Sequence, residues 1–135
     1  MEQEKLKEIN SYLIKIQMQN EALKEWIYST QLGHPLKEYF IKNGVKNIAI
    51  YGDGDIGLLL CKELINTSDI NVCCFIDRQA RENPFGIRNV QHYEASLGVD
   101  LVVVTPLADF NEIKQKLTKE GAKKVVSLAD VIREA

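Results

Sequence analysis

A glycine-rich segment in the first half of the chain has the spacing of a phosphate-binding loop. Gly52-Asp53-Gly54-Asp55-Ile56-Gly57 has the spacing G-x-G-x-x-G, directly after an apolar β-type run and before a helical pattern. In this context the first glycine permits a tight turn, the second lets the backbone approach a pyrophosphate, and the third lets helix and strand pack closely. The backbone amides at the start of the helix, from Asp55 to Gly57, would face the phosphates with the helix dipole behind them. The segment therefore predicts nucleotide binding.

An acidic residue follows at the distance that a ribose contact requires. Asp77 lies 20 residues beyond Gly57, at the end of a second apolar run. A carboxylate at this position accepts hydrogen bonds from the adenosine ribose hydroxyls and disfavours the extra phosphate of NADP. Arg78 and Arg81 favour NADP instead, because their guanidinium groups could hold a 2′-phosphate. NAD is the expected cofactor, with NADP as the alternative.

Two carboxylates inside the loop oppose this prediction. Asp53 and Asp55 would place negative charge close to a pyrophosphate and work against the helix dipole. Three alternatives stay open: the side chains point into solvent, Asp55 caps its own helix, or the turn has lost its ligand.

The elements that would position these residues alternate between strand and helix from Lys46 onward, which predicts a parallel sheet with crossover helices. Right-handed crossovers around a first-strand switch point give the strand order 3-2-1-4-5. We therefore expect an α/β, Rossmann-like fold with an added long N-terminal helix. The expected strands are Asn47–Tyr51, Asn71–Ile76, Ile87–Val90, Asp100–Thr105 and Lys124–Leu128. The expected helices after the first strand are Asp55–Asn66, a turn at Tyr93–Leu97, Asp109–Glu120 capped by Asp109, and Ala129–Arg133.

The N-terminal segment, residues 3 to about 30, has a seven-residue apolar repeat typical of a coiled coil. At one a position the residue is Asn20 and not an apolar residue. A single Asn at an a position fixes the register of a coiled coil and the number of its helices. The alternative is that the stripe packs on the globular part of the same chain, with Trp26 and Tyr28 as anchors. We expect residues 1–32 to form a dimerisation helix and residues 33–135 to form the nucleotide-binding domain. The a positions are Leu6, Leu13, Asn20 and Ile27, and the d positions are Ile9, Ile16 and Leu23.

Composition excludes several other classes of protein. A net charge of -2 and a pI near 5.7 argue against a nucleic-acid partner held by bulk electrostatics. No apolar run approaches the roughly 20 residues that a membrane span needs. The three cysteines lack the spacing of metal ligands, so no metal site is expected. The charged N-terminus carries no hydrophobic signal core, which predicts a cytoplasmic protein.

Three motifs carry a resemblance to a known family. IAIYGDGDIGLLLCKEL, followed by NVCCFID and later by DLVVVT, resembles the Rossmann-like domain of bacterial nucleotide-sugar and polysaccharide-biosynthesis proteins, found in nucleoside-diphosphate-sugar epimerases and dehydratases. The likeness covers about Lys46 to Ile132. It implies that Gly52, Gly54, Gly57 and Asp77 contact NAD(P) or a nucleotide sugar, and that Thr105 and Pro106 border the ligand cleft.

The chain departs from that family in its catalytic residues. The epimerases carry Tyr-x-x-x-Lys, whereas no tyrosine here has a lysine four residues later. The first hypothesis is therefore a nucleotide-binding module, dimeric, that works in nucleotide-sugar or polysaccharide biosynthesis without a complete catalytic site. The second is a small NAD-dependent oxidoreductase or sugar-nucleotide epimerase or dehydratase, or a fragment of one, completed by a partner enzyme. The third is a sensor that reads an NAD-type ligand.

Overall fold

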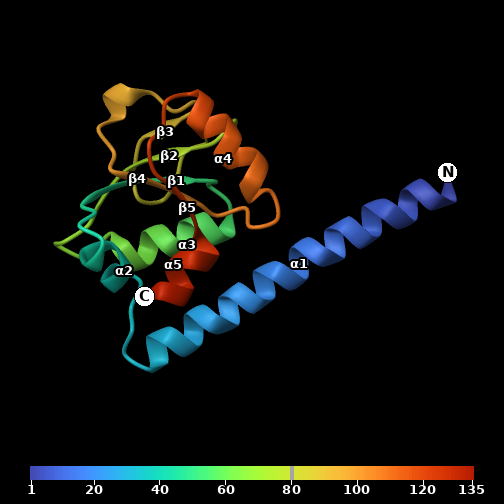
Figure 1. The fold of residues 1–135 in the computed structure, drawn as a ribbon, viewed down its shortest axis with the longest axis horizontal. Helices are drawn as coiled ribbons and strands as arrows, with labels where there is room; N and C mark the ends of the chain where they lie inside the picture. Colours follow the sequence, from blue (N-terminus) through green and yellow to red (C-terminus); the bar gives the residue numbers. More distant parts are fainter. Residues whose placement is uncertain (80) are drawn as a thin grey trace.

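Five apolar segments pair into one parallel sheet in the computed structural model, which describes residues 1–79 and 81–135 (Figure 1). The spatial order β3-β2-β1-β4-β5 confirms the α/β fold and the strand order expected from the sequence. All four strand pairs are parallel, and the register sets Ile50 of the central strand beside Phe75 and Val103. The strands are β1 (Asn47–Tyr51), β2 (Asn71–Ile76), β3 (Asn89–Val90), β4 (Leu101–Val104) and β5 (Val125–Ser127).

The third strand is two residues shorter than expected, because a loop side chain forms hydrogen bonds with the backbone of Ile87, the first residue of the expected strand. Asn83 Oδ1 accepts a hydrogen bond from the Ile87 backbone N–H at 3.1 Å, and Asn83 Nδ2 donates to the Ile87 carbonyl at 2.7 Å. Both backbone groups of Ile87 are thus satisfied inside the loop, so this residue does not join the ladder. Pairing with β2 begins only at Asn89.

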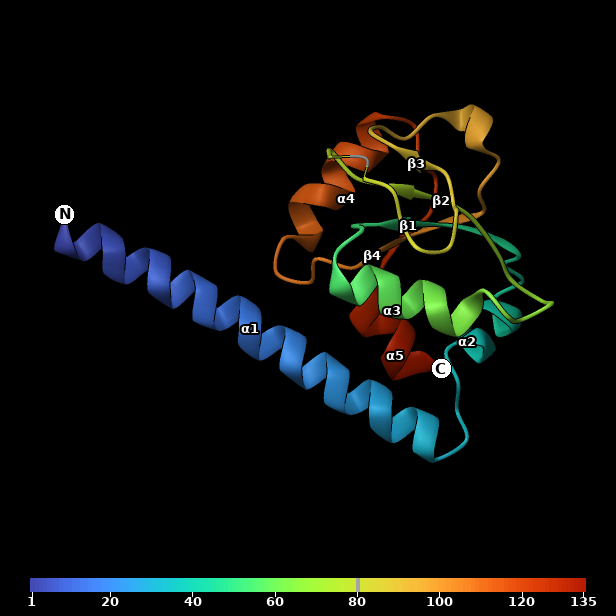
Figure 2. The same ribbon diagram turned by 180° about the vertical axis from the view of Figure 1, so that it is seen from behind.

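Helices cover both faces of the sheet, as the crossover rule requires. The first face packs against α2 (Lys37–Lys42), α3 (Asp55–Leu64) and α5 (Leu128–Glu134), and the second against α4 (Phe110–Lys119) and the 3₁₀ turn η1 (Ala95–Leu97) (Figures 1 and 2). The alternation of side chains along β1 accounts for this split: Ile48 and Ile50 point into the first core, Ala49 and Tyr51 into the second. The helices expected at Asp55–Asn66 and Tyr93–Leu97 are both two residues longer than those observed.

The long N-terminal helix α1 (Glu2–Gln31) is fixed to the domain by its C-terminal half. Ala22 and Trp26 are its two buried residues, and Trp26 Nε1 donates a hydrogen bond to Glu63 Oε1 at 2.8 Å. Tyr28, the other expected anchor, is 66% exposed and does not hold the helix. Figures 1 and 2 show the N-terminal half of α1 extending beyond the globular part. Over residues 1–79 and 81–135, none of the helices combines the length and apolar character of a membrane span.

Candidate functional site

The glycine loop joins β1 to α3, and two of its glycines are required by the fold. Gly52 has a φ of +98°, and a Cβ there would lie 2.5 Å from Thr105 Oγ1. A Cβ on Gly57 would lie 2.0 Å from the carbonyl oxygen of Gly52, so the strand and helix can meet only at a glycine. Gly54 differs, because a Cβ there would meet no atom within 4 Å. The exposed Gly54 therefore leaves the outer side of the loop open to a ligand.

The first amides of α3 come directly after this open position. Gly54 is the N-cap, and the amides of Asp55, Ile56 and Gly57 have no hydrogen-bond acceptor among the described residues. The side chain of Asp55 is exposed and makes no capping hydrogen bond, so the expectation that Asp55 caps its own helix is wrong. An exposed residue at the first helical position can turn its carboxylate away from a bound anion.

Asp53 does not point into solvent, contrary to one of the alternatives weighed from the sequence. Its side chain is only 3% exposed, and its carboxylate accepts hydrogen bonds from Arg81 Nη2 and Asn89 Nδ2, both at 3.0 Å. Burial alone would raise the pKa of Asp53, but the hydrogen bonds from Arg81 and Asn89 outweigh it and lower this pKa. The carboxylate is thus ionised and compensated within the protein, which removes most of its repulsion toward a phosphate.

Asp77 holds the loop as well as facing the site. Its Oδ2 accepts a hydrogen bond from the Asp53 backbone N–H at 3.2 Å, and its Oδ1 accepts one from the Gln79 N–H at 3.0 Å. A carboxylate oxygen accepts two hydrogen bonds, so each oxygen retains a lone pair for a ribose hydroxyl. Asp77 can therefore fix the conformation of the loop and still bind a sugar.

A cleft of about 490 Å³ lies at the carboxyl edge of the sheet, lined by Tyr51 just before the loop and by Asp77, but by none of the predicted site residues from Gly52 to Gly57. Its volume is within the usual range of small-molecule sites. Arg78 and Pro106 line it, whereas Thr105, which the family resemblance places at a ligand cleft together with Pro106, does not: this residue is 6% exposed and its hydroxyl donates to the Tyr51 carbonyl at 2.8 Å. The residues that line the cleft include Tyr51, Asp77, Arg78, Pro106, Glu112 and Lys116.

α4 contributes a wall of the cleft that was not predicted from the sequence. Asp109, Glu112 and Lys116 recur at steps of three and four, which places them on one side of the helix, facing the cleft. This spacing of polar residues was the feature of the sequence that could have indicated that α4 borders the site. Asp109 occupies the N-cap position of α4 but makes no capping hydrogen bond, so its expected role as a cap is wrong. Its carboxylate instead lies 3.6 Å from Lys15 Nζ of α1.

This contact brings the N-terminal helix to the edge of the site. Lys15 and Gln19 of α1 line a small cavity of about 140 Å³ together with the loop Thr105–Asp109. No local sequence pattern indicates a contact between segments so far apart in the chain.

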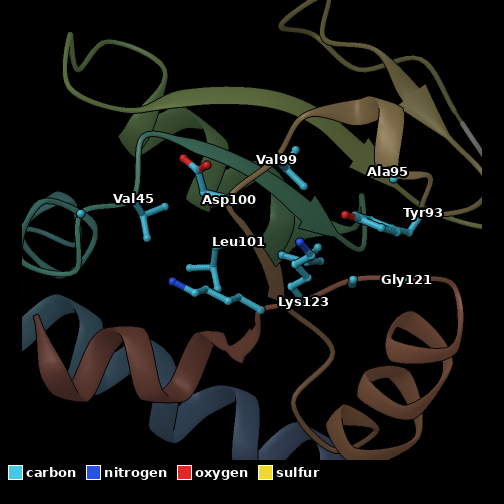
Figure 3. Close-up of a pocket in the computed structure, with 12 residues that line it drawn as sticks. Val45, Tyr93, Ala95, Val99, Asp100, Leu101, Gly121 and Lys123 are labelled. Atoms are coloured by element: carbon cyan, nitrogen blue, oxygen red, sulfur yellow. The ribbon is translucent and has the colours of Figure 1, made fainter.

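The opposite, amino-terminal edge of the sheet has a second cavity, of about 410 Å³ (Figure 3). The carboxylate of Asp100 in its wall accepts hydrogen bonds from the backbone N–H groups of Lys46 and Asn47 at 3.0 and 2.9 Å. Asp100 therefore ties the starts of β1 and β4 together, as expected for a residue at that end of the strand. Ligands of open α/β sheets bind outside the carboxyl ends of the strands, so the glycine loop and its cleft form the candidate site.

No group of three or more His, Cys, Asp or Glu residues within residues 1–79 and 81–135 could hold a metal ion. In comparisons with known proteins, the chain matches no protein-family model, no curated protein and no solved structure at a significant level.

Proposed function

We propose that this chain is a nucleotide-binding module that takes an NAD-type dinucleotide or a nucleotide sugar at the carboxyl edge of its sheet. The observation that carries the proposal is the loop itself: its outer side is open at Gly54, while the amides of Asp55, Ile56 and Gly57 have no acceptor among the described residues. Phosphate oxygens supply such acceptors, and the dipole of α3 favours their charge. The ribose would then bind Asp77, and the rest of the nucleotide would enter the cleft.

A nucleotide with free ribose hydroxyls fits this site better than one with a 2′-phosphate. Arg81, one of the two arginines that could hold that phosphate, is paired with Asp53 at 3.0 Å. The carboxylate of Asp77 would also repel a 2′-phosphate at the end of β2. NAD is therefore the cofactor we propose over NADP.

The proposed setting is nucleotide-sugar or polysaccharide biosynthesis, supported by the resemblance of the three sequence motifs. Because the Tyr-x-x-x-Lys motif of the related enzymes is absent from this sequence, a catalytic role would require residues from a partner enzyme. A cytoplasmic location belongs to the same proposal and is supported by the three free cysteines.

Calorimetric titration with NAD, NADP and UDP-glucose tests the proposal. We expect saturable binding of at least one of these, weakened about tenfold or more by Gly54→Val, because the valine side chain obstructs the approach of the phosphates. Gly54 has φ −74° and ψ −170°, an extended conformation that valine adopts readily, so the variant should fold. Lys123→Ala, at the opposite edge of the sheet, is the control and should bind like the parent. Absence of binding by the folded parent, or equal affinities of parent and Gly54→Val, would refute the site.

A second candidate function is a sensor in which α1 reports the state of the site. It is favoured by the ion pair between Lys15 of α1 and Asp109, which also lines the cleft. Under this hypothesis, saturating ligand changes the hydrogen exchange of α1 amides around Lys15. Identical exchange with and without ligand would argue against it.

A further inference from the structure

Residues 2–15 of α1 are exposed on every side of the helix in the single chain, and the seven-residue repeat is exposed with them. Four of the large apolar residues at its a and d positions are more than half exposed. These residues are Leu6 at 58%, Ile9 at 54%, Leu13 at 51% and Ile27 at 56%. Burying such a stripe against another surface would remove a large apolar area from water.

The domain packs against a different face of the same helix. Ala22 and Trp26 are buried in the first core, and Lys15 and Gln19 line the small cavity at the β4–α4 loop. These four residues occupy c and g positions of the repeat. Around the helix axis, the middle of the c and g side chains lies about 110° from the middle of the a and d side chains. Of the repeat itself, Leu23 is half-buried against the first core and Ile16 is half-buried, so packing on the chain's own domain accounts for only part of the apolar repeat.

The exposed stripe continues into an apolar groove at the C-terminal end of α1. The groove has a volume of about 580 Å³ and is bounded on one side by Leu23 and Ile27, which are d and a residues of the repeat. The other wall is α3, where Leu59 is 46% exposed. Because α1 and α3 bound it together, the groove can receive the end of a second helix that lies along the stripe.

We propose that the occupant is a second copy of this chain, with the two α1 helices parallel in a two-stranded coiled coil. The seam from Leu6 to Ile27 is roughly 32 Å long at a rise of about 1.5 Å per residue. At its end, the partner's Ile27 lies at the groove and contacts Leu59. This dimer is independent of the nucleotide site.

The position of Asn20 selects the parallel orientation. In a parallel pair, equivalent a residues face each other, so the two Asn20 amides can hydrogen-bond across the seam. In an antiparallel pair a residues face d residues, so Asn20 would face Ile9, Ile16 or Leu23 and its amide would lack a partner. The g and e′ residues that flank a parallel seam bring no like charges together. The flanking pairs are Lys5 with Asn10, Tyr12 with Gln17, and Gln19 with Lys24, whereas Trp26 at the last g position is buried in its own domain.

Two neighbouring residues provide a matched test of the seam by sedimentation velocity. Leu13, at an a position, and Ile14, at a b position outside the seam, are 51% and 55% exposed in the single chain. Glutamate at either position should therefore leave the monomer fold intact, as circular dichroism can verify. We expect the parent and Ile14→Glu to sediment as dimers, and Leu13→Glu to weaken association at least about tenfold. A monomeric parent, or equal association of the two variants, would overturn the proposal.

Disulfide trapping tests the orientation. Asn20→Cys in a Cys73→Ala background places one new thiol on the seam of each chain, while Cys61 and Cys74 are buried. In the parallel dimer the two new thiols face each other and should link on mild oxidation. In an antiparallel pair each new thiol faces a d residue of the other helix, so the two thiols are offset along the axis by about 4.5 Å or more, too far for a disulfide. A dimer that fails to link would overturn the parallel arrangement, and Ile14→Cys serves as the control that should not link.

Discussion

Replacing Glu63 with glutamine tests how the N-terminal helix is held to the domain. Both carboxylate oxygens of Glu63 are used: Oε1 accepts from Trp26 Nε1 at 2.8 Å, and Oε2 accepts from the Leu36 backbone N–H at 3.1 Å. Glutamine has the same shape but only one oxygen. Its NH₂ group would face one of the two N–H donors and could not accept a hydrogen bond from it. The variant therefore loses one of the two hydrogen bonds.

The expected fall in melting temperature follows from the number of hydrogen bonds lost and the length of the chain. A hydrogen bond to a charged acceptor contributes about 1.5–3 kcal/mol, and the partial burial of this one favours a value of about 2 kcal/mol. At about 2.1 cal/mol/K per residue, a domain of this size has an unfolding entropy of roughly 0.28 kcal/mol/K. We therefore expect Glu63→Gln to lower the melting temperature by about 7 °C.

Thermal unfolding followed by circular dichroism and by tryptophan fluorescence measures this change. Trp26 is the single tryptophan of the chain, so its emission reports directly on the anchor. Glu25→Gln, at an exposed position of α1, is the matched control, and all samples are compared at one protein concentration because association shifts the midpoint. Trp26→Phe and the double variant Glu63→Gln/Trp26→Phe contain no tryptophan and are followed by circular dichroism alone, and the double variant should lose less than the sum of the single losses. Equal midpoints for Glu63→Gln and Glu25→Gln would refute the anchor.

Three further predictions concern the loop and the cysteines. Gly57→Ala should lower the free energy of unfolding in urea by more than about 3 kcal/mol, because its Cβ would lie 2.0 Å from the Gly52 carbonyl; a smaller loss would show that the loop adjusts. The folded pKa of Asp53 is lowered below its unfolded value, so its contribution to stability is present above the unfolded pKa and is lost as the pH falls through the folded pKa. The difference in urea stability between the parent and Asp53→Asn should therefore shrink below about pH 4, and a constant difference would contradict this sign. Burial raises the pKa of Cys61 and of Cys74 to about 11, so a thiol reagent at about pH 8 should leave both unlabelled in the folded protein and label them in urea.

The sequence predicted those parts of the fold that depend on local patterns. The spacing of Gly52, Gly54 and Gly57 located the strand, turn and helix, because the turn needs a positive φ at Gly52 and the close contact between strand and helix needs a glycine at position 57. The apolar runs and the turns between them were sufficient to place the strands in order 3-2-1-4-5. The third strand was placed two residues too early, since the capture of Ile87 by Asn83 depends on the conformation of a loop.

Contacts between distant segments could not be predicted in this way. The inward orientation of Asp53 depends on Arg81 and Asn89, which are 28 and 36 positions away in the chain. The pairing of Lys15 with Asp109 joins two helices that are almost a hundred residues apart. The repeat in α1 identified an apolar face, but only the structure shows that the domain packs on a different face.

Amide NMR during titration with NAD and with UDP-glucose shows directly whether the loop between β1 and α3 binds a nucleotide. We predict progressive, saturable shifts of the backbone amides from Gly54 to Gly57 and of Asp77, with little change at Lys123 and Lys124 at the opposite edge. Unchanged loop amides at saturating concentrations of both ligands, or shifts confined to the opposite edge, would contradict nucleotide binding by the loop.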